Sequence, residues 1–320
     1  MRIKRIAWLL LAVPALCVAE VPSRDFDVEG HRGARGLAPE NTLAAFRRAL
    51  AIGVTTIETD IAVTKDLVPV ISHNPNLVPE LTRDAAGHWL ARPGPSIHSL
   101  TLDELRHYDI GRTNPQTRYA RDFPQQQPSD GERFPTLREL LDLVAHAPPV
   151  RLNIETKLTP DNAGDTVDAT TFVRVIMDAV RDAKLGDRVT IQSFDWRTLV
   201  EVKRVAPEVR TSCLTIESEG MNTMAAPDGK SPWHAGFSTR DYPSIPALVK
   251  AAGCSTWSMF WRNLTPTLVQ QAHVIGITVL PWTVNEIADM QKLIDMGVDG
   301  IISDYPDRLR DVVIKRRGTQ

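Results

Sequence analysis

Short runs rich in β-branched residues alternate with stretches of helical periodicity along most of the 320-residue chain. The runs expected to be strands are 27–31, 54–63, 151–156, 188–193, 209–214, 255–259, 277–282 and 300–303. The expected helices with the clearest periodicity are 40–52, 172–184, 264–275 and 287–296. Eight strands alternating with helices predict an α/β fold, a TIM-type (β/α)₈ barrel. An open doubly wound sheet is the second possibility, but no GxGxxG loop follows a strand to favour it.

One long segment breaks this alternation. Residues 76–134 contain six prolines and scattered glycines, with little periodicity outside 101–108. An irregular segment of this length inside a compact domain is usually functional. We therefore predict an insertion after the second strand and its hairpin, covering one rim of the barrel. A second irregular segment, 217–242, is also expected to lie over the surface.

Residues 1–19 have the pattern of a secretory signal peptide. Basic residues precede an apolar run over 6–16, and the small Ala19 stands at a plausible cleavage point before Glu20. The apolar run is too short to span a bilayer, which favours a cleaved signal over an uncleaved anchor. We expect an exported protein whose single domain is 20–320: periplasmic in a Gram-negative bacterium, secreted otherwise.

The charge balance indicates no polyanionic partner. The whole chain has a formal net charge of −2, and removing three basic residues with the signal leaves 34 basic against 39 acidic residues, or −5. No basic surface therefore points to nucleic acid, and no stable membrane association is expected. The sequence leaves the oligomeric state open.

Two cysteines, Cys213 and Cys254, remain after the expected cleavage. An oxidising compartment would allow them to pair, but pairing depends on a distance that the sequence does not give. We expect them to be unpaired and buried, because free cysteine behaves as a small hydrophobic residue. Neither has CxxC spacing beside a histidine, so a zinc or redox site is not indicated.

Charged side chains gather at the carboxyl ends of the expected strands. His31 ends the first strand, Glu58 and Asp60 lie two apart on the second, and Glu155 lies on the third. Residues two apart on a strand share a face, and the carboxyl ends of barrel strands meet at one mouth. Three carboxylates converging there would repel one another unless a cation bridged them. Oxygen ligands suit Ca²⁺ or Mg²⁺ rather than zinc.

A hairpin is expected to bring His73 to the same place. The chain turns at 65–68, a connection too short for a parallel crossover, so the returning strand should be antiparallel. A turn centred between Asp66 and Leu67 would place His73 across from Asp60.

These residue types together predict a phosphodiester site. Arg32 and Lys157 suit a phosphate clamp, and His31 and His73 suit acid–base catalysis of phosphoryl transfer near neutral pH. A divalent cation would polarise the phosphoryl oxygens. Trp282 ends a strand and is assigned to the substrate.

The same residue types also have structural interpretations. Glu155 and Lys157 alone could form an ion pair inside the barrel. Two other tryptophans, Trp257 and Trp261, are expected to be packing residues. The remaining histidines considered are expected to be structural or on the surface: His88, His98, His107, His146 and His273.

Nine ordered motifs resemble the glycerophosphodiester phosphodiesterase family. They start at His31, Pro39, Glu58, Thr64, Pro69, Glu155, Gln192, Trp282 and Asp299, and read HRG, PENT, ETD, TKD, PVISH, ETK, QSFD, WTVN and DGIISD. The resemblance runs from about 27 to 310, nearly the whole mature chain. Two positions depart from the family's pattern, since Asn74 replaces the usual Asp and Leu67 replaces the usual Gly.

The resemblance implies a TIM barrel that hydrolyses small-molecule glycerophosphodiesters to glycerol 3-phosphate and an alcohol, through a cyclic phosphate formed by the glycerol 2-hydroxyl. It implies a general acid–base pair, His31 and His73. It implies Ca²⁺ or Mg²⁺ ligands, Glu58, Asp60 and Glu155. It implies phosphate contacts, Arg32 and Lys157. Glu40 is expected to bond the turn at His31 rather than approach the metal.

Two other functions remain open. A phospholipase-D-like enzyme acting on lysolipids or sphingomyelin would need an apolar exposed loop, whereas the insertion is mostly polar. A catalytically silent binding protein is disfavoured because the complete set of acidic and histidine residues is present. A neutral Asn74 is expected to raise the pKa of His73 less than Asp would.

Overall fold

The computed structural model describes residues 26–161, 164–226 and 228–317. Its strands are β1 (Asp27–Gly30), β2 (Thr56–Val63), β3 (Pro69–Ile71), β4 (Arg151–Thr156), β5 (Val189–Ser193), β6 (Arg210–Thr215), β7 (Thr256–Met259), β8 (Thr278–Val279) and β9 (Gly300–Ser303). All except β3 run parallel, in the order β8-β7-β6-β5-β4-β2-β1-β9. Backbone N–H groups of Asp299 and Ile302 donate to the carbonyls of Val279 and Pro281, which joins the two ends of the sheet. The predicted TIM-type barrel is confirmed.

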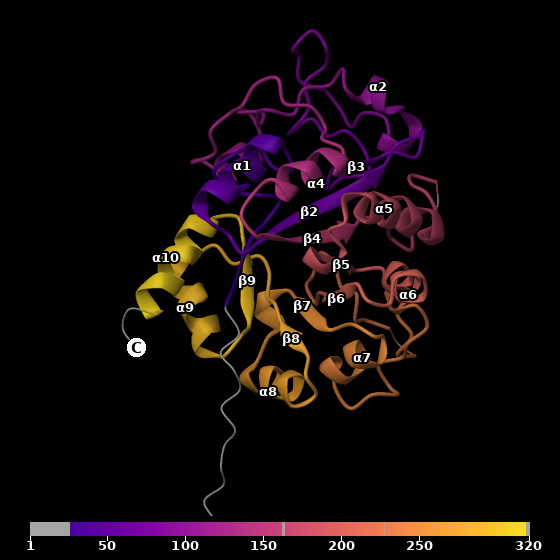
Figure 1. The fold of residues 1–320 in the computed structure, drawn as a ribbon, viewed down its shortest axis with the longest axis vertical. Coiled ribbons are helices and arrows are strands. Elements are labelled where there is room, and N and C mark those ends of the chain that lie inside the picture. The colour runs from indigo at the N-terminus through magenta and orange to yellow at the C-terminus, as the bar shows by residue number, and fades with distance from the viewer. Residues whose placement is uncertain (1–25, 162–163, 227, 318–320) are drawn as a thin grey trace, which may run out of the picture.

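Helices cover the outside of the barrel (Figure 1). They are α1 (Leu43–Ile52), α2 (Leu102–Leu105), α3 (Arg118–Asp122), α4 (Leu137–Ala145), α5 (Ala169–Ala183), α6 (Trp196–Val205), α7 (Ile245–Ala251), α8 (Pro266–Val274), α9 (Ile287–Asp295) and α10 (Pro306–Arg317). None of these helices in the described residues is both long and apolar enough to cross a bilayer. The predicted signal, 1–19, lies outside the described residues.

Helix α1 supports the turn that follows β1. The Thr42 hydroxyl caps the helix by accepting from the Ala45 N–H, and Gly53 ends it in the left-handed conformation. Gly33 in the turn has φ +85°, and a Cβ there would lie 2.8 Å from the Ala45 backbone. Only glycine therefore allows the turn to pack this closely on α1.

The hairpin of β2 and β3 corrects the predicted register by one residue. Ile61 pairs with Ile71, and the Ser72 N–H donates to the Asp60 carbonyl, so Ser72 rather than His73 lies across from Asp60. The cause is a three-residue turn in which Leu67 takes φ +62°. The predicted turn had two central residues, and the extra residue shifts the pairing. His73 still reaches the site because it lies just beyond the end of β3.

The insertion after β3 builds a small hydrophobic core of its own. Its buried members, with two contributed by the hairpin, are Ala62, Val70, Leu77, Ile97, Leu105, Ile110 and Phe134. The segment carries α2 and α3 and caps one end of the molecule, drawn at the top of Figure 1. Tyr119 donates a hydrogen bond to Glu40, and Gln126 donates to the Arg35 carbonyl at 2.8 Å. The insertion therefore contacts the rim that carries the turn after β1.

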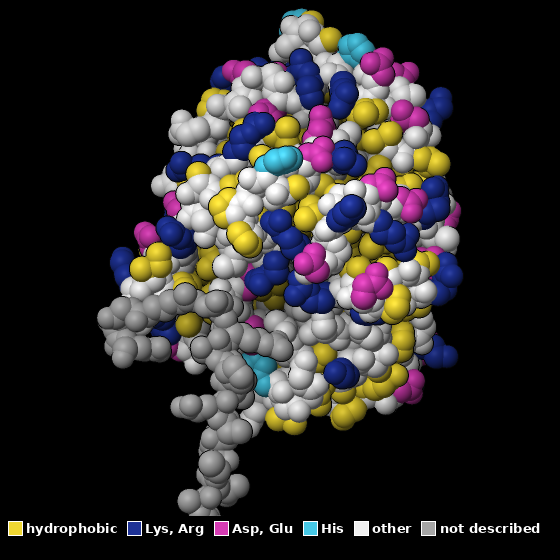
Figure 2. Space-filling model, viewed as in Figure 1, with side chains coloured by type: hydrophobic (Ala, Val, Ile, Leu, Met, Phe, Trp, Pro, Cys, Tyr) yellow, Lys and Arg dark blue, Asp and Glu magenta, His cyan; other side chains and the backbone are white. Residues whose placement is uncertain are grey.

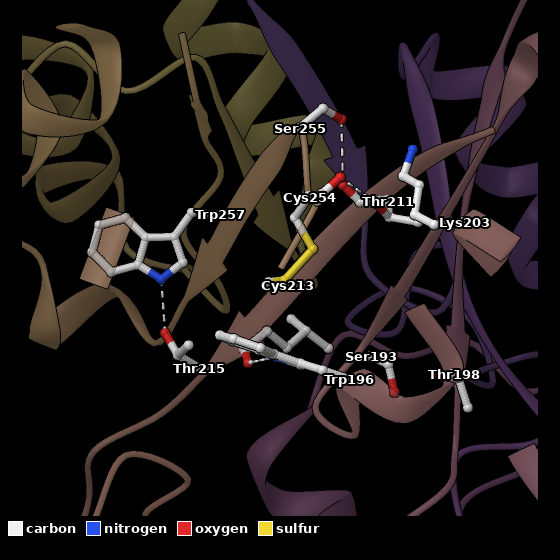
Figure 3. Close-up of a disulfide and its surroundings, with 12 residues drawn as sticks. Ser193, Trp196, Thr198, Lys203, Thr211, Cys213, Thr215, Cys254, Ser255 and Trp257 are labelled. Atoms are coloured by element: carbon white, nitrogen blue, oxygen red, sulfur yellow. Dashed lines mark hydrogen bonds between the residues drawn. A yellow bond between two sulfur atoms is a disulfide. The ribbon is translucent and has the colours of Figure 1, made fainter. Parts of the chain in front are cut away.

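Cys213 and Cys254 form a disulfide, so the expectation of unpaired thiols is wrong. The bond joins β6 to the residues just before the neighbouring strand β7, above the buried Trp196 (Figure 3). The two Cα atoms are 5.9 Å apart, within the usual range for a disulfide. Both cysteines are buried, as expected. Their proximity comes from strand adjacency across 41 residues of sequence, which composition does not reveal.

The surface shows mixed charge on the face drawn in Figure 2. Lys and Arg side chains gather near its centre, with acidic side chains among and around them. Hydrophobic side chains of the described residues lie scattered between polar ones in this view. Scattered apolar side chains are normal for a protein surface.

Candidate active site

A cavity of about 250 Å³ opens at the carboxyl ends of the barrel strands. Seven of the eight predicted site residues line it: His31, Arg32, Glu58, His73, Glu155, Lys157 and Trp282. The eighth, Asp60, is fully buried and belongs to the acidic cluster beside the cavity. The barrel thus brings together residues spread over some 250 positions of sequence, as the convergence of parallel strand ends requires.

The turn after β1 is fastened to the second strand. Arg32 takes a left-handed conformation with φ +49°, and its backbone N–H donates to Glu58 Oε2 at 2.8 Å. The Gly33 N–H donates to the Glu58 carbonyl at 3.2 Å. Arg32 Nη1 donates to Glu40 Oε1 at 2.8 Å, so Glu40 bonds this turn. Among the described residues, the acidic cluster does not include Glu40.

Glu58, Asp60 and Glu155 form a buried cluster of carboxylates. One oxygen from each lies within 4.8 Å of the others. Strand register produces this arrangement, because Asp60 on β2 pairs directly with Glu155 on β4. Asp60 Oδ1 is buried and accepts no hydrogen bond from any described residue. An oxygen-only set with an unsatisfied buried acceptor fits a hard divalent cation such as Ca²⁺ or Mg²⁺.

The charges of this cluster are only partly compensated by the protein. Burial, and then the charges of Asp60 and Glu155, raise the pKa of Glu58 well above its usual value. Burial also raises the pKa of Glu155, although Lys157 opposes the effect. Burial would raise the pKa of Asp60 too, but His73, Lys157 and Arg32 outweigh it and hold that pKa below its usual value. A cation bound here would favour the ionised form of all three carboxyls.

His31 is held by a carboxylate from the far end of the chain. Its Nδ1–H donates to Asp304 Oδ1 at 2.7 Å, which leaves Nε2 facing the cavity, 3.9 Å from Glu58 Oε2. Asp304 also accepts two hydrogen bonds from Arg35 and one from Asn285. Burial, followed by the charge of Arg35, lowers the pKa of His31 to about 4. The ring is therefore neutral near pH 7, and its unprotonated Nε2 faces the site.

His73 is oriented by its neighbour. The Asn74 side-chain oxygen lies 3.1 Å from Nδ1, and an amide oxygen only accepts, so Nδ1 carries the proton. Burial and then the charges of Arg32 and Lys157 lower the pKa of His73 well below its usual value. An anionic substrate between these two cations would reduce that effect.

Both expected phosphate ligands are tied to the acidic cluster. Lys157 Nζ donates to Glu155 Oε1 at 2.7 Å and lies 3.6 Å from Asp60 Oδ1. Arg32 Nε lies 3.5 Å from Asp60 Oδ2 and makes no hydrogen bond within the described part of the chain. Arg32 therefore has a donor available for a ligand.

Comparison with known proteins agrees with this geometry. The family model described as "Glycerophosphoryl diester phosphodiesterase family" matches residues 31–308. The chain belongs to this family. A crystal structure of a putative glycerophosphoryl diester phosphodiesterase from Silicibacter pomeroyi is 38% identical, with a TM-score of 0.82, covering 92% of this chain and 95% of that one.

Curated members of the family are more distant in sequence but match over at least 90% of their length. A glycerophosphodiester phosphodiesterase from Caldanaerobacter subterraneus is 29% identical over 90% of this chain and 98% of its own. Probable glycerophosphodiester phosphodiesterase 2 from Mycobacterium tuberculosis is 29% identical over 89% and 90%. Such coverage leaves no large part of this chain outside the family's fold.

Several residues of this family member's site were not assigned a role from sequence. The sequence did offer a signal for three of them, because each is the first or last residue of a family motif: Asp304, Asn285 and Gln192. Asp304 contacts His31 and Gln192 contacts Glu58 across long sequence separations, and Asn285 donates to Asp304. Nothing in the sequence indicated a role for Arg35 except its position just after the first motif.

Phe194 and Trp282 line the cavity and belong to an aromatic cluster. Its members, Phe194, Trp233, Phe260 and Trp282, follow strands β5, β7 and β8 or belong to the loop before α7. Phe194 meets Trp282 edge-on at 5.5 Å between ring centroids, and Phe260 lies 6.0 Å from Trp282. Trp282 thus lines the cavity, whereas Trp257 is buried and donates to Thr215 Oγ1 (Figure 3).

Proposed function

We propose that this chain is an exported, divalent-cation-dependent phosphodiesterase that converts glycerophosphodiesters to glycerol 3-phosphate and an alcohol. The observation that carries the proposal is the meeting of two partly buried histidines with the carboxylate cluster in one cavity. Membership of the glycerophosphoryl diester phosphodiesterase family supports it, as do the names of the curated relatives.

His31 suits the general base. Its Nε2 faces the cavity, and Asp304 would stabilise the imidazolium that forms when Nε2 takes the proton of the glycerol 2-hydroxyl. The freed oxygen attacks phosphorus of the same molecule, and the leaving alcohol departs. The nucleophile belongs to the substrate, which removes much of the entropic cost of the attack.

His73 suits the general acid that protonates the leaving oxygen. Arg32 and Lys157 lower its pKa in the free protein, and a bound phosphodiester anion would offset those two charges. The same cations would hold the non-bridging phosphoryl oxygens. Glu58, Asp60 and Glu155 would hold Ca²⁺ or Mg²⁺, which supplies polarisation of the phosphoryl group when bound. In a second half-reaction water opens the cyclic phosphate, with the two histidines exchanging roles.

The disulfide supports the export part of the proposal. Disulfides persist in oxidising compartments and are rare in reducing ones. The Cys213–Cys254 bond agrees with the signal-like sequence of residues 1–19. A fractionation experiment on the native host, with a cytosolic marker as control, tests it; recovery of the unprocessed chain in the cytosol contradicts it.

The activity is tested by release of glycerol 3-phosphate from glycerophosphocholine. Purified protein is assayed with Ca²⁺, with Mg²⁺ and with EDTA, beside His31→Ala. His88→Ala is the matched control, because His88 is exposed and does not line the cavity. We expect cation-dependent release that His31→Ala abolishes and His88→Ala retains. A folded wild-type protein that releases nothing with either cation contradicts the proposal and makes lysophosphatidylcholine the next substrate to assay.

A further inference from the structure

A chain of four buried polar side chains crosses the interior of the barrel. Asn153 Nδ2 on β4 donates to Glu29 Oε2 on β1 and to Gln192 Oε1 on β5, both at 3.0 Å. Gln192 Nε2 donates to Glu58 Oε1 at 3.0 Å. Each of the four residues is no more than 3% exposed. Glu29 thus connects through two amides to a carboxylate of the acidic cluster.

With Glu58 ionised, the form that binds a cation, the direction of each of these three hydrogen bonds is fixed. Glu58 accepts from Gln192, so the Gln192 side-chain nitrogen faces Glu58 and its oxygen faces Asn153. Asn153 must then donate, and its Nδ2 has two hydrogens, one for Gln192 and one for Glu29. Rotating either amide would place two acceptors or two donors against each other. Asn153 is therefore held between Glu29 and Gln192, and Gln192 is held between Asn153 and Glu58.

Glu58 is held at both oxygens. The Arg32 backbone N–H fixes Oε2, and the Gln192 amide fixes Oε1. Two anchors on opposite oxygens set the plane of the carboxylate and leave the remaining lone pairs for a ligand. The first anchor comes from the mouth of the site, and the second depends on the chain that begins at Glu29.

Glu29 and Asn153 also line a second cavity, into which the Asn153 amide could turn. A polar cavity of about 560 Å³ at the amino-terminal end of the barrel is lined by Glu29, Asn153 and Ser212, among others. Asn153 Oδ1 has no hydrogen-bond partner in the described residues. Without Glu29, the Asn153 amide could turn toward this cavity, and Gln192 would lose its partner.

We propose that Glu29, Asn153 and Gln192 are positioning residues that hold Glu58 in the orientation needed to bind a divalent cation. Glu29 thereby sets cation affinity from the far end of the barrel. The proposal rests on the proposed function only in taking Glu58 as a cation ligand. Outer residues that orient metal ligands typically change metal affinity 10- to 100-fold when replaced.

The test compares Glu29→Leu with Glu29→Gln. Glutamine is the matched replacement, because it has the size and shape of glutamate. Its amide oxygen still accepts from Asn153, whereas leucine cannot. We expect Glu29→Leu to weaken Ca²⁺ and Mg²⁺ binding at least about 10-fold in isothermal titration calorimetry. Glu29→Gln should stay within about twofold of wild type on the same comparison.

Ser212→Ala is the control for damage to the amino-terminal cavity. Ser212 is buried in the same cavity and its hydroxyl has no hydrogen-bond partner in the described residues. It should leave cation affinity unchanged. If Glu29→Leu does not fold, Gln192→Met is measured instead, since it removes the Glu58 contact directly. Unchanged affinity in a folded Glu29→Leu or Gln192→Met protein overturns the proposal, and so does a wild-type protein that binds neither cation.

Calorimetry separates this proposal from the proposed activity. Wild-type protein that binds cations but hydrolyses no diester would contradict the activity, while the variants would still judge the positioning chain. If the wild-type protein is active and Glu29→Leu binds cations as tightly as it does, the positioning role of Glu29, Asn153 and Gln192 is contradicted, and the proposed activity is not. The cation concentration for half-maximal turnover, measured on the same variants, should follow the calorimetric order.

Discussion

The Cys213–Cys254 disulfide should contribute a large share of the stability of the barrel. It closes a loop across 41 residues of sequence, and the chain-entropy relation gives about 4 kcal/mol for a loop of that size. Both cysteines are buried, and the bond joins β6 to the residues just before the adjacent strand β7. Its loss should therefore lower the free energy of global unfolding rather than free only a surface segment.

The measurement is equilibrium urea unfolding of three proteins. They are the oxidised wild type, the wild type reduced while unfolded and refolded with reductant, and the double variant Cys213→Ala/Cys254→Ala. Trp196 and Trp257 are buried near the bond (Figure 3), so tryptophan fluorescence reports unfolding of this region. We expect the reduced and the double-variant proteins to be less stable than the oxidised one by about 4 kcal/mol.

Reduced wild-type protein separates the cross-link from packing. It keeps both sulfur atoms and loses only the bond, whereas the double variant also loses side-chain volume. A fall in the double variant alone would assign the stability to packing. Reduced protein within about 1 kcal/mol of the oxidised protein would refute the loop-closure argument.

Three further predictions concern the site and its support. Asp304→Asn removes the carboxylate that stabilises a protonated His31, and kcat should fall at least about 100-fold with little change in KM; wild-type kcat would contradict this role. His234 is fully buried, and burial lowers its pKa from 6.5 to about 4. The unfolded chain then binds the proton first, so the free energy of unfolding should fall by up to about 3 kcal/mol as pH drops from 6.5 to 4. His234→Phe should reduce that fall in urea melts at pH 7 and pH 4.5, leaving the part due to His31 and His73, whose pKa values burial also lowers; an unchanged fall would contradict the role of His234. Gly33→Ala should cost about 2 kcal/mol or more, because φ is +85° and helix α1 leaves no room for a Cβ; thermal melts measure it, and an unchanged melting temperature would show that the turn can move.

Regular elements with strong local patterns were predictable. The boundaries of β4 and β9 agree with the expected 151–156 and 300–303. Helix α10 (Pro306–Arg317) was not expected, because charged residues dominate it and few apolar positions define a face. It is helical because it packs against β1 and α9. Tertiary packing outweighs weak periodicity in such a segment.

The acidic cluster was predictable because it follows from the alternation of side chains along a strand and from the barrel that the sequence pattern predicts. Glu58 and Asp60 share a face since side chains alternate along a strand, and parallel strands end at one mouth of a barrel. Those two rules place carboxylates together without knowledge of any long-range distance. The same holds for the histidine that ends β1.

Contacts between distant residues were decided only by the folded structure. The pairing of Cys213 with Cys254, the support of His31 by Asp304 and the chain from Glu29 to Glu58 each join residues at least 29 positions apart. The hairpin register was decided by one residue, Leu67, in a left-handed conformation. The hydrophobic periodicity of a sequence reports the geometry of a single helix or strand. Which side chains then meet across the barrel depends on how all the strands are placed together.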